Sequence, residues 1–369
     1  MSAVLIADIE PDSRDSGAVA HYGDPMREQR TLATAAGLVD RSHRGVIAVP
    51  GPERLTWLHS LTTQHLTTLA PGQGTELLVL SPHGHVEHHA LVAEDGTTTW
   101  LDTEPDRAGP LLDFLTKMRF LTRVEPAEVT ADWGLLSLVG PAAADALAGL
   151  GPVSGAVAGL GSALAGLAPP EVAPVPGPKF ASVDVPGRPT TLYSVASLPG
   201  GGWARRMGYG YDLLVPRASV PEWSERLDVP WVGVWAFEAL RVADRRPRYG
   251  LETDHRTIPA EVGWLADAVH VDKGCYRGQE TVARVHNLGR PPRRLVLLHL
   301  DGISTDTLPE PGTKVSTVDG REIGFVGTAV RHHELGMIAL ALVKRSVPDT
   351  EPLRVAESAA AIDPATDPA

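Results

Sequence analysis

The sequence is poor in cysteine, in long apolar runs and in basic charge. A single cysteine in 369 residues excludes an intrachain disulfide and fits a reducing compartment, so we expect a cytoplasmic protein. No run of 18 or more apolar residues occurs, so we expect no membrane-spanning helix and no membrane partner. The acidic start has no basic segment before an apolar stretch, which argues against a secretory signal. The net charge of −12 argues against direct nucleic-acid binding.

The composition is that of an ordinary globular protein, with 43% hydrophobic and 21% charged residues. The length suits two or three domains and allows a substantial core without disulfides or metal. Shifts in composition divide the chain into six predicted segments: a mobile N-terminus (1–20), a first subdomain (21–141), an Ala/Gly/Pro-rich connector (142–178), a second subdomain (179–291), a small antiparallel barrel or sandwich (292–347) and a disordered tail (348–369).

Strand and helix patterns alternate in the first half of the chain. Residues 44–51 are typical of a strand that ends in a Pro-Gly-Pro turn, and apolar residues at helical spacing predict a helix within 52–66. A second amphipathic helix is predicted at 111–121. Hairpin-like strands interleaved with helices favour an α+β architecture over a doubly wound parallel sheet.

The most distinctive segment is VDKGCYRGQETVARVHNLGRP, residues 271–291. It contains Cys275, with Gly274 directly before it and Gly278 three residues after it. Glycine allows positive φ angles and leaves room for a closely approaching ligand. These positions therefore mark Cys275 as a candidate reactive residue.

Basic residues surround this thiol in the sequence. Lys273, Arg277 and Arg284 raise the local positive potential, which lowers the pKa of a thiol and favours the thiolate. A helix that begins near Gly278 would add its N-terminal dipole. The alternative is that Cys275 is a small buried apolar residue, which is the commoner fate of a single cysteine. The lack of a second cysteine argues against a self-contained zinc or iron–sulfur site.

Residues 273–280, KGCYRGQE, resemble the K-G-C-Y-x-G-Q-E signature of the YgfZ family. The fixed positions present are Lys273, Gly274, Cys275, Tyr276, Gly278, Gln279 and Glu280. Residues 37–64 are similar to the opening strand–helix unit of that family. Residues 238–264 resemble the segment that precedes the signature in YgfZ proteins and in the glycine-cleavage T protein. The resemblance extends over residues 21–347.

This resemblance implies an α+β aminomethyltransferase folate-binding fold, with two α+β subdomains and a C-terminal antiparallel β-barrel around a central channel. It implies tetrahydrofolate or another reduced folate as the cofactor. YgfZ proteins support the assembly, maintenance or repair of iron–sulfur enzymes, including a tRNA methylthiolase, so iron–sulfur client enzymes or cluster-assembly proteins are the expected partners. The resemblance also gives the catalytic candidates Cys275, Lys273, Tyr276, Gln279 and Glu280.

The main alternative is a tetrahydrofolate-dependent aminomethyltransferase or demethylase. The T protein has a K-G-D-F sequence where this chain has KGCY at 273–276. Its pterin-anchoring glutamate falls at Gly208 and its catalytic aspartate near Gly109, although Asp102 and Asp106 lie close to the second position. The loss of two carboxylates would remove much of the transfer mechanism. We therefore expect an accessory protein that binds folate rather than a transferase.

Candidate folate contacts come from one predicted helix and from the signature. Trp235 and Phe237 lie where the family places a folate-contacting tryptophan, and either ring could instead belong to the core. Arg241 or Arg245 could bind a carboxylate of the glutamyl tail. The remaining candidate cofactor-binding residues are Gly274, Gly278 and Arg284.

A histidine-rich run and a basic run carry weaker predictions. On a regular strand, one face would hold His83, His85, Glu87 and His89. That set could bind zinc or nickel, but Gly84 predicts a turn that breaks the alternation, so we predict no metal site. The run DRRPR at 244–248 is interpreted as a solvated turn.

Overall fold

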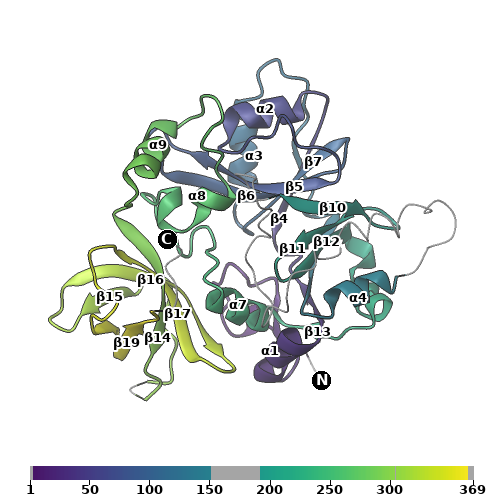
Figure 1. Ribbon diagram of the computed structural model, residues 1–369. Coiled ribbons are helices and arrows are strands. Elements are labelled where there is room, and N and C mark those ends of the chain that lie inside the picture. The colour runs from purple at the N-terminus through teal and green to yellow at the C-terminus, as the bar shows by residue number, and fades with distance from the viewer. Residues whose placement is uncertain (1–2, 151–191, 304, 365–369) are drawn as a thin grey trace.

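The computed structural model describes residues 3–150, 192–303 and 305–364. Three lobes surround a central region, with the barrel at the lower left of Figure 1, helices α2 (Arg54–Leu61) and α3 (Ala108–Lys117) at the top, and α4 (Ala143–Ala148) at the right. Helix α7 (Val234–Ala243) lies between them. Most of the predicted connector, from 151 onward, lies outside the described residues.

One 11-stranded sheet runs through the top and right lobes in the order β13-β3-β9-β12-β11-β10-β5-β6-β7-β4-β8. Its strands are β3 (Gly37–Asp40), β4 (Gly45–Pro50), β5 (Gln73–Leu80), β6 (Val86–Glu94), β7 (Thr98–Thr103), β8 (Ala127–Glu128), β9 (Trp133–Val139), β10 (Tyr193–Ser197), β11 (Trp203–Met207), β12 (Gly210–Pro216) and β13 (Trp231–Val232). Neighbours pair antiparallel except β13 and β3, which pair in parallel. The β10–β5 pair joins the two halves of the sheet.

Helices cover each half of the sheet and bury its apolar face. The remaining helices are α1 (Pro25–Thr34), α6 (Trp223–Leu227), α8 (Trp264–Asp267) and α9 (Gln279–Leu288), with 3-10 turns η1 (Ile6–Asp8), η2 (Arg217–Glu222) and η3 (Pro259–Glu261). Helix α1 begins where the Asp24 carboxylate accepts hydrogen bonds from the next turn and proline occupies the first helical position. Leu58, Leu111 and Leu115 of α2 and α3 pack on β4 to β7. Each such leucine contributes about 1.5–3 kcal/mol by its burial.

Helix α7 is apolar on most sides because it is buried on most sides. It packs against α1, against β2 (Val19–His21) and against the barrel strand β16 (Glu322–His332), so it joins the lobes. Val234, Phe237, Leu240 and Val242 are all buried in it. This helix carries the candidate folate contacts into the centre of the molecule.

Six antiparallel strands close the C-terminal barrel in the order β14-β17-β16-β15-β18-β19. The remaining strands are β14 (Arg293–Leu300), β15 (Lys314–Thr317), β17 (Gly336–Lys344), β18 (Leu353–Val355) and β19 (Ser358–Ile362). The prediction of a disordered tail from 348 is therefore wrong up to Ile362. Leu353, Val355, Ala360 and Ile362 alternate with exposed residues and fill the barrel core. β19 pairs with β14 and removes the open edge of the sheet.

The prediction of a mobile N-terminus is also wrong for the described part of that segment. Strand β1 (Val4–Leu5) pairs with β2, and Ile6, Ala18 and Ala20 are buried in the core that includes α7. Asp15 is buried as well. The alternation of acidic and small residues hid these anchors, since their partners lie far away in the chain.

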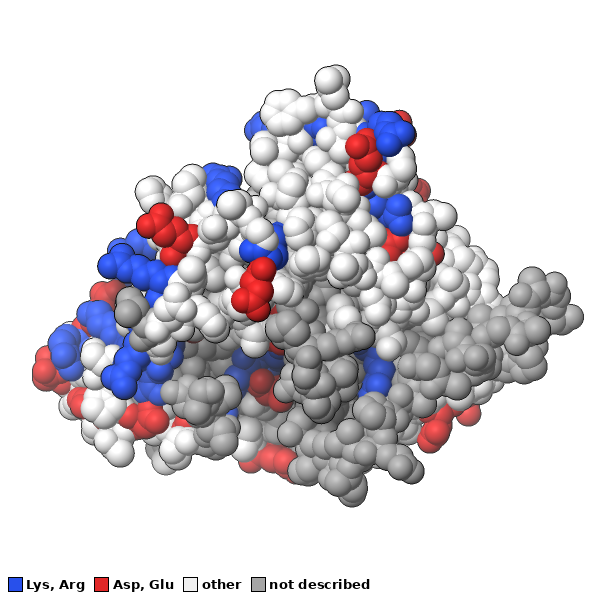
Figure 2. All heavy atoms as spheres, turned by 45° about the horizontal axis from the view of Figure 1, so that its top comes forward, with Lys and Arg blue, Asp and Glu red and all other residues white. Residues whose placement is uncertain are grey.

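The fold class agrees with the sequence prediction: an α+β fold with a closed, six-stranded antiparallel barrel at its C-terminal end. On the face in Figure 2, Lys and Arg side chains lie beside Asp and Glu side chains, with broad uncharged areas between them. Among the described residues, no helix is both long and apolar enough to cross a membrane.

Candidate functional site

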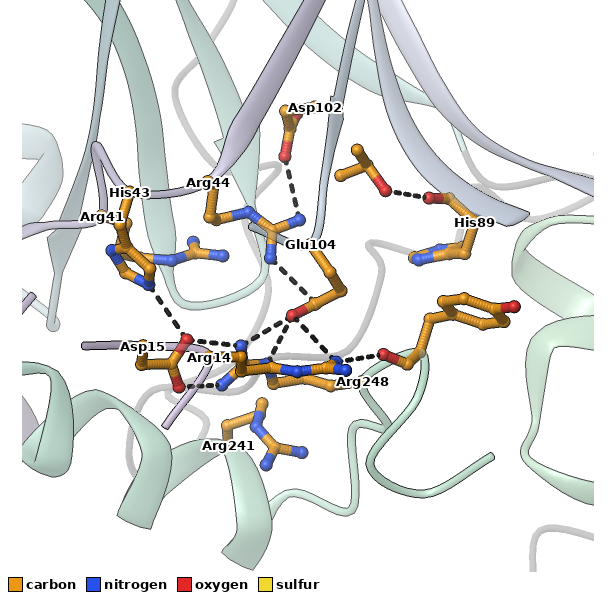
Figure 3. A network of polar contacts seen from close by, with 12 residues as sticks. Arg14, Asp15, Arg41, His43, Arg44, His89, Asp102, Glu104, Arg241 and Arg248 are labelled. Atoms are coloured by element: carbon orange, nitrogen blue, oxygen red, sulfur yellow. Dashed lines mark hydrogen bonds and ion pairs between the residues drawn. The ribbon is translucent and has the colours of Figure 1, made fainter. Parts of the chain in front are cut away.

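A small cavity of about 80 Å³, open to solvent, lies where the β3–β4 loop, β5, β6, the β11–β12 turn and α7 meet. Its charged lining residues are Arg41, Arg44, Arg241, Arg246, Arg248, Glu76, Glu104 and Glu238. The other lining residues are His43, His89, Leu91, Met207, Tyr209, Val234, Phe237, Pro247 and Trp264. Both subdomains thus contribute to one polar, partly aromatic chamber, of which Figure 3 shows one wall.

Glu76 is a buried carboxylate on β5 with three partners. It accepts hydrogen bonds from the Tyr193 hydroxyl at 2.5 Å, from Arg246 at 2.8 Å and from His89 Nε2 at 2.9 Å. Burial alone would raise the pKa of Glu76, but Arg246 and His89 outweigh it and hold the pKa well below its usual range. Glu76 is therefore ionised and fully engaged.

Glu104, directly after β7, lies between two arginines. It accepts hydrogen bonds from Arg44 at 2.9 Å and from Arg248 at 2.6 Å (Figure 3). Glu238 on α7 pairs with Arg241 at 2.8 Å and with Arg248 at 3.2 Å. Burial would raise the pKa of both carboxyls, but the adjacent guanidinium groups lower it. All three acidic residues that line the cavity are thus held in the ionised form by arginine.

Aromatic rings form the other part of the lining. Phe237 is only 3% exposed and meets Tyr209 edge to face, with ring centroids 5.3 Å apart. The Arg41 guanidinium lies 4.4 Å from the Phe237 centroid, so it covers one face of that ring. On the opposite side, His89 stacks on Trp264 at 4.5 Å. A flat heterocyclic ligand would find aromatic and cationic groups on two sides of this chamber.

The candidate contacts on α7 divide between the cavity and its surroundings. Phe237 and Arg241 line the cavity, whereas Trp235 packs at the edge of the core beside His21. The Arg241 guanidinium donates to Glu238, to Thr328 Oγ1 and to the carbonyl of Arg246. Internal groups already use these donors, which limits what Arg241 can offer to a ligand carboxylate.

The prediction of a solvated turn at 244–248 is wrong. Arg246 pairs with Glu76 and Asp267, and Arg248 is buried among acidic groups that line or adjoin the cavity. In three of these contacts, the arginine and its partner are 144 to 233 residues apart in the chain. Reasoning from the basic run and its sequence neighbours could not identify these distant carboxylate partners.

Lys273, a catalytic candidate, ties the signature to the last turn of α2 and to the loop after it. Its ammonium group donates to the carbonyls of His59 at 2.5 Å, Thr62 at 2.6 Å and Gln64 at 3.0 Å. Burial lowers the pKa of Lys273 to about 8. Tyr276 is buried with Trp264 in one apolar cluster, so the loop is fixed on both sides of Cys275.

Cys275 itself is exposed, so the interpretation as a small buried apolar residue is wrong. Gln279 Oε1 accepts a hydrogen bond from the Tyr276 amide at 2.9 Å and closes the loop at the start of α9. The helix begins next to Gly278, as the sequence predicts. Glu280 and Arg284 are exposed on this helix.

The two signature glycines, Gly274 and Gly278, differ in whether a side chain would fit at their positions. Gly278 has φ +81°, and a Cβ atom there would come within 2.6 Å of the Ser81 carbonyl oxygen. Only glycine fits that position without a shift of the backbone. Gly274 has open space around its Cα and no positive φ, so its identity has no steric cause in this structure. The cavity lining, as the structure describes it, includes no residue of 273–280.

The structure shows the surroundings of Gly208, Gly109 and Asp102, the positions compared with the transferase carboxylates in the sequence analysis. Gly208 lies in the β11–β12 turn, and the next residue, Tyr209, reaches the cavity. Gly109 lies in the first turn of α3, where a Cβ atom would meet no described atom within 4 Å. Asp102 is buried and pairs with Arg205 at 2.7 Å and with Arg44 at 3.4 Å. Its charge is balanced by arginine, like those of the lining glutamates.

Sequence reasoning missed most of the polar lining. The residues concerned are Arg41, His43, Arg44, Glu76, His89, Glu104 and Tyr209. The charged and polar residues at 41–44, directly after β3, could have indicated part of this lining, because side chains just beyond a strand end gather at one edge of a sheet.

The histidine run does not form a common face. Gly84 has φ +79° and β6 begins only at Val86, so the alternation fails before His85. His89 points to Glu76 and Trp264 instead of towards His83. Within the described ranges, no group of three or more His, Cys, Asp or Glu side chains could hold a metal ion.

Comparison with known proteins agrees with this architecture. Residues 22–158 match the family model of the GCVT N-terminal domain. The crystal structure of the glycine cleavage system aminomethyltransferase T from Bartonella henselae superimposes with a TM-score of 0.70, over 94% of this chain and 90% of that chain, at 19% identity. This chain has the aminomethyltransferase fold.

Sequence relatives point the same way. An aminomethyltransferase of Symbiobacterium thermophilum is 29% identical over 335 residues, 83% of this chain and 78% of that protein. A chloroplastic protein of Arabidopsis thaliana, named as a transferase, is 27% identical over 315 residues. The match covers 84% of this chain but only 65% of the Arabidopsis protein.

Proposed function

We propose that this protein binds a reduced folate in the central cavity and serves iron–sulfur enzymes as an accessory factor, rather than acting as an aminomethyltransferase. The observation that carries the proposal is the state of the cavity carboxylates. Glu76, Glu104 and Glu238 are each paired with arginine, and the pKa of each lies below its usual value. Such groups can orient a ligand, but they are poor proton carriers near neutral pH.

Binding of folate is supported by the aminomethyltransferase fold together with the chemistry of the lining. The aromatic rings of Phe237, Tyr209 and Trp264 can pack against a pterin ring. The lining glutamates and arginines hold one another, so a folate would exchange with these internal pairs. A guanidinium group can bind a tail carboxylate in place of an internal one. The chamber is therefore chemically suited to a reduced folate, tetrahydrofolate or a close derivative.

The resemblance places the two carboxylates of the transfer mechanism at Gly208 and near Gly109, with Asp102 and Asp106 close to the second position, and this supports binding without transfer. A second candidate function is nevertheless an aminomethyltransferase, because two relatives of 29% identity are named so. The test is calorimetric titration with tetrahydrofolate, followed by an assay for methylene-tetrahydrofolate formed from an aminomethyl donor. We expect binding without turnover. Turnover at enzymatic rates would overturn the accessory role and favour the transferase.

The iron–sulfur role rests on the resemblance of residues 273–280 to the YgfZ signature and on the exposure of Cys275. An exposed thiol outside the cavity lining is accessible to a partner protein. One cysteine cannot ligate a cluster alone, so a cluster would need further ligands from a partner. We place this role in the cytoplasm, where a free thiol stays reduced.

The role of Cys275 is tested with a strain that carries Cys275→Ala and is assayed for the activity of cluster-dependent methylthiolating enzymes. We expect a loss of that activity with unchanged folate binding. Asp272→Asn, a change at an exposed neighbour in the same loop, is the matched control and should have no effect. Full activity in the Cys275→Ala strain would exclude the role given to the thiol.

A further inference from the structure

Arg248, in the cavity wall, binds one of its carboxylate partners in a way that resembles ligand binding. Its Nε and NH2 groups donate to Glu104 at 3.0 and 2.6 Å. Its NH1 and NH2 groups donate to the two oxygens of Asp15, each at 2.7 Å. The second pair is the two-point geometry by which a guanidinium group holds a free carboxylate. His43 Nε2 lies 3.1 Å from the same Asp15 carboxylate (Figure 3).

Asp15 belongs to a segment that few contacts attach to the rest of the protein. Between Ile6 and Ala18 the backbone hydrogen bonds run within the segment, for example from Glu10 to Ile6 and from Ala18 to Asp15. Most of its side chains are exposed. Apolar residues hold its two ends, and in its middle Arg14 donates to the carbonyl of Tyr249 at 2.6 Å. Asp15 is thus the deepest polar anchor of residues 6–18, which we call the strap.

The charges around Arg248 show what removal of Asp15 would leave. Arg248 faces the carboxylates of Asp15, Glu104 and Glu238. Arg44 shares Glu104, and Arg241 shares Glu238. Without Asp15, both other carboxylates keep an arginine partner. Arg248 NH1 and NH2 still contact Glu238 and Glu104, and each regains the N–H group that Asp15 had accepted. That edge would attract one carboxylate of matching size.

We propose that the NH1–NH2 edge of Arg248, with His43 beside it, is a carboxylate-binding site that Asp15 fills as an internal ligand. A carboxylate of an incoming ligand exchanges with Asp15 and releases the strap. No covalent bond changes in this exchange. The ligand class is an organic carboxylate, and identification of that ligand as a folate tail rests on the proposed function above.

The direct test is chemical rescue, which does not depend on folate. Asp15→Ala keeps the Cβ atom and removes the carboxylate beside Arg248, so a small free carboxylate, added as sodium acetate, should refill the site. We expect the midpoint of thermal unfolding of this variant to rise saturably with acetate, by roughly 2 °C at ten times the dissociation constant. Sodium chloride at equal ionic strength should not reproduce the rise. Asp12→Ala, which removes an exposed carboxylate of the same strap, is the matched control.

A response to acetate in Asp15→Ala that equals the responses of wild type and Asp12→Ala would overturn the proposal. If Asp15→Ala does not fold, Asp15→Asn keeps the shape and removes the charge. Hydrogen exchange of residues 6–18 should then be at least tenfold faster than in wild type, while exchange in the barrel stays unchanged. Unchanged exchange in the strap would refute its anchoring by Asp15.

A ligand arm separates this proposal from the proposed function. 5-Formyltetrahydrofolate carries tail carboxylates, and tetrahydropterin carries none. We expect the folate to bind Asp15→Ala about tenfold more tightly than wild type, and tetrahydropterin to bind both equally. Equal folate affinity would refute exchange with Asp15 and leave folate binding intact. Absence of folate binding together with acetate rescue would refute the proposed function and leave the carboxylate site intact.

Discussion

Replacement of Lys273 by methionine would remove an ammonium group that ties the signature loop to the last turn of α2 and to the loop after it. Each hydrogen bond from a charged donor contributes about 1.5–3 kcal/mol, and Lys273 makes three of them to backbone carbonyls. Burial opposes them: it lowers the pKa of Lys273 from 10.5 to about 8, which corresponds to about 2–3 kcal/mol after allowance for partial solvent contact. Methionine keeps the packing but leaves the carbonyls without a donor, so we expect a loss of about 3 kcal/mol in unfolding free energy.

Equilibrium unfolding in guanidinium chloride measures this loss. The matched control is Lys344→Met, because the ammonium of Lys344 is exposed and donates to a single backbone carbonyl, that of Glu322 at 3.1 Å. That variant should stay within about 0.5 kcal/mol of wild type. A Lys273→Met protein with wild-type stability and no client activity would refute the reasoning, since it would show a chemical role for the ammonium group in place of a structural one.

Two further predictions concern local structure and pH. Gly278→Ala should destabilise the protein by about 2 kcal/mol or more, because the residue has φ +81° and a Cβ atom would meet the Ser81 carbonyl oxygen. Gly274→Ala, the control, should be nearly neutral. Equal effects of the two changes on thermal unfolding would contradict this prediction. Burial, assisted by Arg107, lowers the pKa of His88 to about 4. As the pH falls from 6.5 to 4, the unfolded chain binds a proton at His88 before the folded protein does, so the free energy of unfolding decreases in that window. His88→Asn should therefore reduce the loss of unfolding free energy measured between pH 7 and 5.

Local sequence patterns were sufficient for the fold class. Period-two alternation and turn residues predict the strands of the barrel up to residue 347, and α9 begins directly after Gly278, near the predicted helix start. The helix predicted at 111–121 begins three residues earlier, at Ala108, and ends at Lys117. These features depend on neighbours in the chain, which is why sequence alone could predict them.

The features that sequence reasoning missed depend on distant partners. Arg248 and Asp15 are 233 residues apart, and Arg246 and Glu76 are 170 residues apart. A basic run next to proline gives no indication that its guanidinium groups turn inward to buried carboxylates. The C-terminal strands were hidden for a related reason: their small inward residues, such as Ala360, resemble a low-complexity tail until the barrel surrounds them.

Binding of folate in the cavity that Phe237 lines, separate from the thiol of Cys275, is the central claim. Titration calorimetry with 5-formyltetrahydrofolate on wild type, Phe237→Leu, Cys275→Ala and the exposed-ring control Phe120→Leu tests it most directly. We expect binding by wild type, about 3- to 10-fold weaker binding by Phe237→Leu, and wild-type affinity in the other two variants. Absence of binding by wild type, or its loss in Cys275→Ala alone, would contradict that claim.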